Sequence, residues 1–166
     1  AVGYDVTREF YINDAGRQVK LLAQSVYSRY INKPIPEDGY QGAYIDEISD
    51  SARAVISGIK KGIYSEPIDN EGAATASQVI SLNFPNISFE ESEPFFAWHS
   101  KKRLLEEIRK DLEDFGVRFD NWFSEQSLLD DSSVKKSIEE LKKRGFAYEK
   151  DDALWLRSTA FGDDKD

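Results

Sequence analysis

The first thirty residues place a strand pattern and a helix pattern on either side of a very short turn. Apolar side chains alternate toward one face over residues 4–12, and apolar residues recur at helical spacing from about residue 17 to residue 30. The turn between them contains Asn13 and Asp14, and either would suit the helix N-cap because a short polar side chain accepts from first-turn amides. We predict a strand–turn–helix unit, the kind of junction at which α/β sheets bind ligands.

The rest of the chain mixes helix and strand patterns, which predicts an α+β fold. Apolar residues at helical spacing indicate helices over residues 41–60 and 98–115, and a shorter one begins at Ser132 or Ser133 and stops at Gly145. Strand-like alternation covers residues 117–123, and residues 146–157 show the pattern of a hairpin. The candidate inward side chains of that hairpin are Phe146, Tyr148, Leu154 and Leu156.

Charge is distributed unevenly along the sequence. Residues 62–100 contain no Lys or Arg, whereas the whole chain has 31 acidic and 22 basic residues and a net charge of −9. The acidic segment over residues 62–97 also holds Gly62, Gly72 and three of the five prolines, so we predict a loop-rich connector there. The acidic balance argues against a chain-wide nucleic-acid footprint but leaves a local basic face open.

The residue inventory excludes several kinds of site. Without cysteine there is no disulfide, thiol nucleophile or zinc–thiolate centre, and a single histidine, His99, excludes a two-histidine metal site. No serine–aspartate constellation supports His99 as a general base, so a packing or surface role is favoured. No apolar run approaches the roughly 18 residues of a membrane span, and no signal peptide opens the chain. We therefore expect no metal site, no membrane association and a cytoplasmic location.

Four stretches of the sequence, in this order, resemble bacterial arginyl-tRNA synthetases. They are GYDVTREFYINDAGRQVKLLAQSVYSRY at 3–30, PEDGYQGAYIDEI at 36–48, DLEDFGVRFDNWFSEQSL at 111–128, and ALWLRSTAFGDDKD at 153–166. This family consists of class I synthetases with a Rossmann-type catalytic domain. The resemblance implies a protein that activates L-arginine with ATP and transfers it to tRNA(Arg).

The two sequence motifs with which this family holds ATP are not in the chain. The single histidine precedes Ser100-Lys101-Lys102 rather than forming an HIGH-type motif, and the run Lys135–Ser137 lacks the second half of a KMSKS-type motif. The resemblance implies an internal fragment between the two motifs. We expect ATP, with Mg²⁺, to bind the parent enzyme and not this fragment, which would be inactive alone.

The resemblance also implies how the chain is divided. We expect a strand–helix remnant of the Rossmann-type domain, a mainly helical insertion that contains the hairpin, and a strand that returns to the catalytic domain. These parts correspond to residues 1–31, 32–150 and 151–166. Sheet edges at residues 4–12 and 154–160 would then be exposed, and the fragment could self-associate through them.

Asp14 is the residue that we expect to bind arginine. The resemblance implies it, because the family places an acidic residue of this junction against the substrate, and a carboxylate pairs well with a guanidinium or an α-ammonium. Asn13 and Gln18 flank it, and family members keep a glutamine four places after the acid. The structural alternatives are a helix N-cap for Asp14 and a solvated amide for Gln18.

A second function remains open, in which the segment 32–150 is a non-catalytic module for interdomain contacts or tRNA docking. The cluster Lys101–Arg103 would open the predicted third helix, where cations are unfavourable for the helix dipole. It either pairs with Glu106 and Glu107 or contacts tRNA phosphates. An arginine-dependent change at the Asp14 junction would count against this module.

Overall fold

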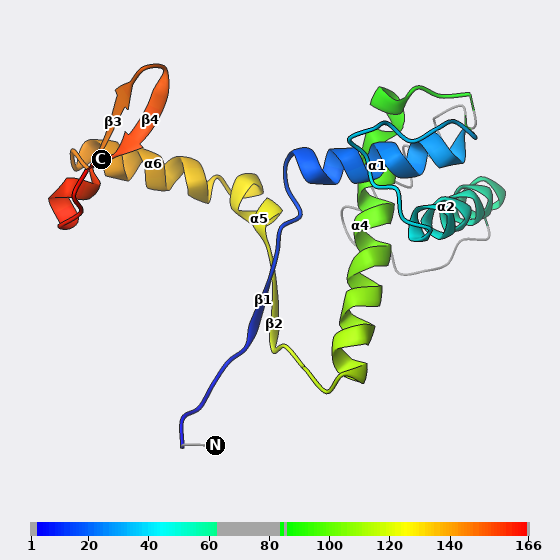
Figure 1. Ribbon diagram of the computed structural model, residues 1–166, viewed down its shortest axis with the longest axis horizontal. Helices are drawn as coiled ribbons and strands as arrows, with labels where there is room; N and C mark the ends of the chain where they lie inside the picture. Colours follow the sequence, from blue (N-terminus) through cyan, green and yellow to red (C-terminus); the bar gives the residue numbers. More distant parts are fainter. Residues whose placement is uncertain (1–2, 63–83, 85, 166) are drawn as a thin grey trace. The chain divides into compact units, whose positions relative to one another are not determined.

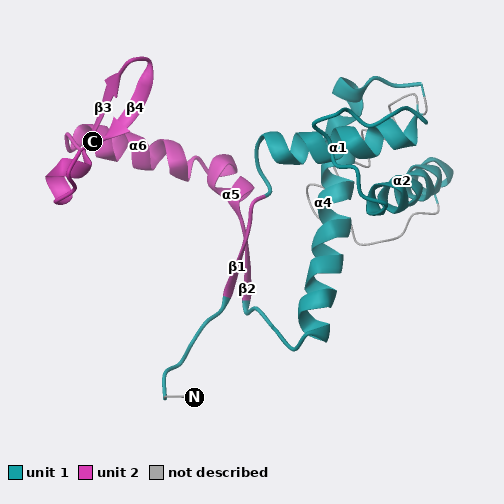
Figure 2. Cartoon of the chain, viewed as in Figure 1, with its two compact units in different colours: residues 1–8, 14–120 teal, residues 9–13, 121–166 magenta. Residues whose placement is uncertain are grey.

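The computed structural model describes residues 3–62, 84 and 86–165. The chain divides into two compact units, coloured separately in Figure 2: unit 1 comprises residues 1–8 and 14–120, and unit 2 comprises residues 9–13 and 121–166. In chain order the elements are β1 (Glu9–Ile12), α1 (Arg17–Tyr30), α2 (Tyr44–Lys61), α4 (Phe89–Asp114), β2 (Asn121–Ser124), α5 (Glu125–Asp130), α6 (Ser133–Lys143), β3 (Ala147–Lys150), β4 (Ala153–Leu156) and the 3₁₀-helix η1 (Ser158–Phe161).

Unit 1 is a helical body in which α1 packs against both α2 and α4 (Figure 1). Its core is built around Phe95 and Phe96 of α4, both fully buried, whose rings lie 5.1 Å apart at 81°. Tyr30 of α1 meets Phe96 edge-on at 5.3 Å. Such tilted and edge-on aromatic contacts add to the free energy gained by removing the rings from water.

The predicted helix over residues 41–60 is confirmed as α2. Its buried apolar residues recur at helical spacing and face α1 and α4; they are Ile45, Ile48, Ala52, Ile56 and Ile59. Gly62 ends the helix with φ 67°, the left-handed conformation that glycine adopts without steric cost.

α4 begins earlier than the sequence pattern indicates, and the predicted start at residue 98 is wrong. Ser88 and Glu91 form a capping box, because the Ser88 hydroxyl accepts from the Glu91 amide and the Glu91 carboxylate accepts from the Ser88 amide. The helix continues through Pro94 because the free energy gained by burying Phe95 and Phe96 offsets the cost of a proline inside a helix. Residues 89–97 of the predicted loop-rich connector are therefore helical, and residues 63–83 and 85 lie outside the described part.

Unit 2 contains two small sheets. β1 and β2 pair in parallel, with Glu9 opposite Asn121 and Ile12 opposite Ser124. β3 and β4 form the predicted hairpin, whose two-residue turn Asp151-Asp152 has positive φ at both positions, the conformation of the tightest hairpin turns. The α+β class and the hairpin are confirmed, whereas the helix α5 was not predicted.

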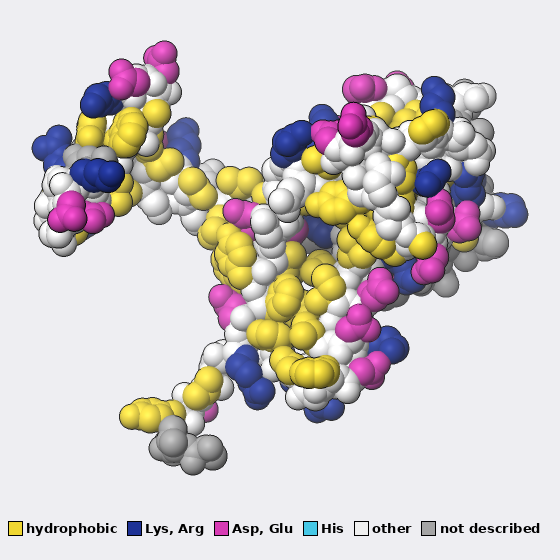
Figure 3. Space-filling view, in the orientation of Figure 1, with side chains coloured by type: hydrophobic (Ala, Val, Ile, Leu, Met, Phe, Trp, Pro, Cys, Tyr) yellow, Lys and Arg dark blue, Asp and Glu magenta, His cyan; other side chains and the backbone are white. Residues whose placement is uncertain are grey.

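Few side chains of unit 2 are buried. Ala147 is the sole hydrophobic residue of this unit that is buried among the described residues. Leu154 and Leu156 are 44% and 49% exposed, so their predicted inward placement is wrong, and Trp155 beside them is exposed rather than in a core. Figure 3 shows hydrophobic side chains at the surface around the hairpin. Within the described residues, no helix is both long and apolar enough to cross a membrane.

Candidate functional site

The junction that leads into α1 differs from the predicted capped turn. The N-cap of α1 is Gly16, with φ 81° and ψ −156°, and no side chain caps the helix. This backbone conformation is open essentially to glycine alone. Because α1 starts only at Arg17, Asn13 and Asp14 are too early in the chain to cap it, and the predicted capping role is wrong.

Asp14 is buried and its carboxylate faces a cation from α4. The Lys101 ammonium lies 3.4 Å from Asp14 Oδ2, and the two side chains are 16% and 5% exposed, respectively. A carboxylate this far from water depends on an opposite charge, and removing one partner of such a pair costs about 3–5 kcal/mol. In this structure the Asp14 carboxylate therefore already binds a positively charged group, the Lys101 ammonium.

The two residues predicted to flank Asp14 in the site lie differently. Asn13 and Gln18 are both exposed, whereas Asp14 is buried. Asp14 and Gln18 are not separated by one helical turn, because the chain reaches helical geometry only after Gly16. Of the predicted site residues, Asp14 alone combines burial with a charged partner.

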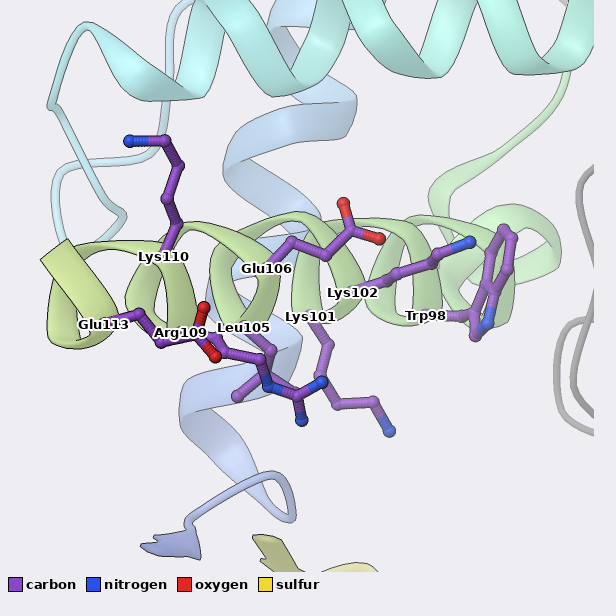
Figure 4. Close-up of a pocket in the computed structure, with 8 residues that line it drawn as sticks. All are labelled: Trp98, Lys101, Lys102, Leu105, Glu106, Arg109, Lys110 and Glu113. Atoms are coloured by element: carbon purple, nitrogen blue, oxygen red, sulfur yellow. The ribbon is translucent and has the colours of Figure 1, made fainter. Parts of the chain in front are cut away.

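Lys101 also lines a groove of about 500 Å³ along α4 (Figure 4). In that view Lys101, Leu105 and Arg109 extend from the same side of the helix, and Lys110 points the other way. Lys102 places its ammonium 5.5 Å from the centre of the Trp98 ring. The residues that line the groove are Trp98, Lys101, Lys102, Leu105, Glu106, Arg109, Lys110 and Glu113.

The basic cluster Lys101–Arg103 lies in the middle of α4 rather than at its start, so the predicted conflict with the helix dipole does not arise. Arg103 pairs with Glu106 at 3.1 Å, as the helical spacing suggested. Sequence reasoning missed Lys101 as the partner of Asp14 because the pair depends on how α4 packs against α1. Nothing in the pattern around Lys101 marks it among the other lysines.

His99 and Trp98 belong to the core of unit 1. The His99 ring stacks on Phe95 with 5.7 Å between ring centres and 6° between planes, and both His99 and Trp98 are about 3% exposed. Of the two roles expected for His99, packing or surface, the structure shows packing.

The acidic pair Asp130-Asp131 has a structural role. Asp131 Oδ1 accepts from the Ser133 amide at 2.7 Å, where α6 begins. Hydrogen bonds from the side chain and backbone of Ser133 lower the pKa of Asp131 below its ordinary value, since they stabilise the carboxylate. Within residues 3–62, 84 and 86–165, no group of three or more His, Cys, Asp or Glu residues could hold a metal ion.

Comparison with known proteins gives one consistent result. No protein-family model matches the chain. An alignment of 179 positions with the arginine–tRNA ligase of Legionella pneumophila shows 42% identity. The alignment covers 100% of this chain and 30% of that protein. A second alignment, of 169 positions with the ligase of Bacillus subtilis, shows 43% identity and covers 99% of this chain and 26% of that protein.

A solved structure agrees with these sequences. A crystal structure described as an arginyl-tRNA synthetase from Campylobacter jejuni matches 99% of this chain and 31% of its own chain, with a TM-score of 0.66 and 27% identity. The chain thus spans 26–31% of the length of the relatives named here.

Proposed function

We propose that this chain, which is homologous along its whole length to a segment of arginine–tRNA ligases, forms part of an enzyme that activates arginine with ATP and transfers it to tRNA(Arg). The observation that carries the proposal is identity of 42–43% over 99–100% of the chain with ligases of two distant bacteria. The resemblance inferred from four separate stretches of sequence is therefore confirmed.

ATP binding is assigned to parts of the ligase outside this chain. The sequence contains neither an HIGH-type nor a KMSKS-type motif. No step of ATP chemistry is derived from the residues present, and the isolated chain is expected to be inactive.

Within this enzyme, Asp14 is proposed to contact a cationic group of arginine. In support, its buried carboxylate lies where the chain leaves a strand and enters α1, and it already pairs with an ammonium at 3.4 Å. A guanidinium could bind the same carboxylate with two parallel hydrogen bonds. Asn13 and Gln18, which are exposed on either side of it in sequence, would donate or accept further hydrogen bonds to the substrate.

The alternative is a non-catalytic module that docks tRNA. The observation in its favour is the groove along α4, to which Lys101, Lys102, Arg109 and Lys110 contribute cations. Phosphate contacts by such residues weaken as salt rises. A double variant Lys102→Ala/Arg109→Ala of the full-length protein would then bind tRNA less tightly with a shallower salt dependence, while its KM for arginine stays unchanged.

The test of the proposed function is the charging of tRNA with labelled arginine by the full-length protein, with lysine and glutamine as control amino acids. Arginine alone should be attached. The 166-residue chain should give no arginine-dependent exchange of pyrophosphate into ATP. Failure of the full-length protein to charge arginine would contradict the proposal, and exchange by the isolated chain would contradict the assignment of ATP binding to other segments.

A further inference from the structure

We propose that the Lys101 ammonium competes with arginine for the Asp14 carboxylate, so that substrate binding displaces Lys101. This inference rests on the proposed role of Asp14 in arginine binding. It assigns to α4, a helix distant in sequence from the junction, a direct influence on the affinity of the site.

A cation already occupies the position beside Asp14. The Asp14 side chain is 5% exposed, and the Lys101 ammonium is 3.4 Å from its Oδ2 atom. A second cation brought to the same carboxylate would be repelled by the first, because screening is weak where little water reaches. Arginine and Lys101 therefore exclude each other from close contact with Asp14.

The Lys101 side chain has room to move away from Asp14. Its side chain lines the groove of about 500 Å³ along α4, on the side that also carries Leu105 and Arg109 (Figure 4). A lysine stem is long and flexible, and its ammonium is strongly hydrated. Rotation of this stem would bring the charge from the buried pair into an open, solvated groove.

Contacts other than the pair between Lys101 and Asp14 hold α4 in place within unit 1. Phe95 and Phe96 anchor the helix in the core, and Lys20 of α1 pairs with Glu93 of α4 at 2.9 Å. Breaking the contact between Lys101 and Asp14 would therefore leave α4 packed on α1. The exchange is a movement of one side chain within a fixed framework.

Competition of this kind has a simple consequence for affinity. The apparent dissociation constant of arginine equals its intrinsic value divided by the fraction of time that Lys101 leaves Asp14 unoccupied. If that fraction is about one-tenth, removal of the ammonium strengthens arginine binding about tenfold. A residue that merely orients Asp14 would produce the opposite change, because its removal would loosen the site.

The test is calorimetric titration of the full-length protein with arginine. Lys101→Met removes the charge and keeps an unbranched side chain one heavy atom shorter, and we expect about tenfold tighter binding. Lys101→Arg places a guanidinium in the competing position, so we expect binding weaker than in the wild type because two parallel hydrogen bonds hold it to the carboxylate. Lys102→Met is the matched control, since Lys102 lies over Trp98, and its affinity should equal that of the wild type.

Displacement can also be observed in the wild-type protein. Acetylation of lysines by acetic anhydride, followed by peptide mass spectrometry, should proceed severalfold faster at Lys101 when arginine is saturating and at an unchanged rate at Lys102. This measurement and Lys101→Arg keep the test decisive if Lys101→Met does not fold.

Two results would overturn the inference in distinguishable ways. Competition is contradicted, and the role of Asp14 stands, if the wild type binds arginine but Lys101→Met binds it equally well or more weakly. The same holds if arginine does not change the rate of Lys101 acetylation. If the wild type does not bind arginine, the proposed function fails, and this inference fails with it.

Discussion

The two units of this chain differ in how much of their apolar side-chain surface is buried. Unit 1 buries a continuous set of aliphatic and aromatic side chains between α1, α2 and α4, including Val26, Ile45 and Phe96. Unit 2 is also made of regular elements, two short helices and two small sheets, but it buries almost none of its large apolar side chains, and Trp155 and Phe161 remain 40% and 64% exposed. The contrast teaches that regular hydrogen bonding alone does not make a core, and it locates the stability of the chain in unit 1.

The largest effect is expected from truncation in the core of unit 1. Phe96→Ala removes a fully buried ring that contacts Tyr27, Tyr30 and Phe95, and should lower the free energy of unfolding by about 3–5 kcal/mol. Urea unfolding followed by circular dichroism measures this. Phe161→Ala in unit 2 is the control, and a loss as large as that of Phe96→Ala would break the comparison.

A smaller effect is expected at the start of α1. Gly16 has φ 81° and ψ −156°, so Gly16→Ala imposes a conformation that costs of order 1–3 kcal/mol in a residue with a Cβ atom. Thermal unfolding should show the loss, while the neighbouring exposed variant Gln18→Ala should be near neutral. Equal stability of Gly16→Ala and wild type would mean that the chain enters α1 by another path.

Self-association is expected through unit 2 at high concentration. Each of its sheets has two strands, so both strands of each sheet have an edge with no strand beside it among the described residues, and β4 adds exposed apolar side chains. Leu156→Lys should shift association to higher concentration in sedimentation experiments, with Val134→Lys on α6 as a comparison. A chain that stays monomeric at all concentrations would contradict this expectation.

The smallest effect concerns the ion pair between α6 and β3. Lys142 Nζ lies 2.6 Å from Glu149 Oε1 and lowers the pKa of Glu149 below its ordinary value of 4.5, through the hydrogen bond and then the charge. Its contribution to stability is therefore present above about pH 4.5 and is lost as the pH falls through the lowered pKa. An NMR titration of the Glu149 carboxyl should show the shift, and Lys142→Met should abolish it. An unchanged titration in this variant would exclude the pair as its cause.

Much of the fold could be predicted from the sequence because the apolar residues that recur at helical spacing are the ones that are buried in the core. The helix at residues 44–61 and the hairpin at 147–156 followed directly from pattern and turn chemistry. The start of α4 was misplaced because Pro94 and an acidic composition suggest a loop. The capping box at Ser88 and the burial of Phe95 stabilise a helix there instead. Tertiary packing outweighed local preference there.

The candidate site was predictable only in part. Asp14 was identified from a resemblance, but its cation partner, 87 positions later in the chain at Lys101, depends on how α4 crosses α1. The backbone of Gly16, which moves the helix start beyond Asp14, also reflects a three-dimensional path that no residue pattern specifies. The predicted boundaries at residues 31 and 150 and the arginine-binding roles of Asn13 and Gln18 stay predictions.

Steady-state charging of tRNA by the full-length protein shows whether Asp14 contacts the substrate. For Asp14→Asn, which keeps the shape of the side chain and removes the charge, we expect a KM for arginine roughly tenfold to hundredfold higher, with the KM for ATP unchanged and the protein folded. An unchanged KM for arginine in a folded Asp14→Asn protein would contradict this contact.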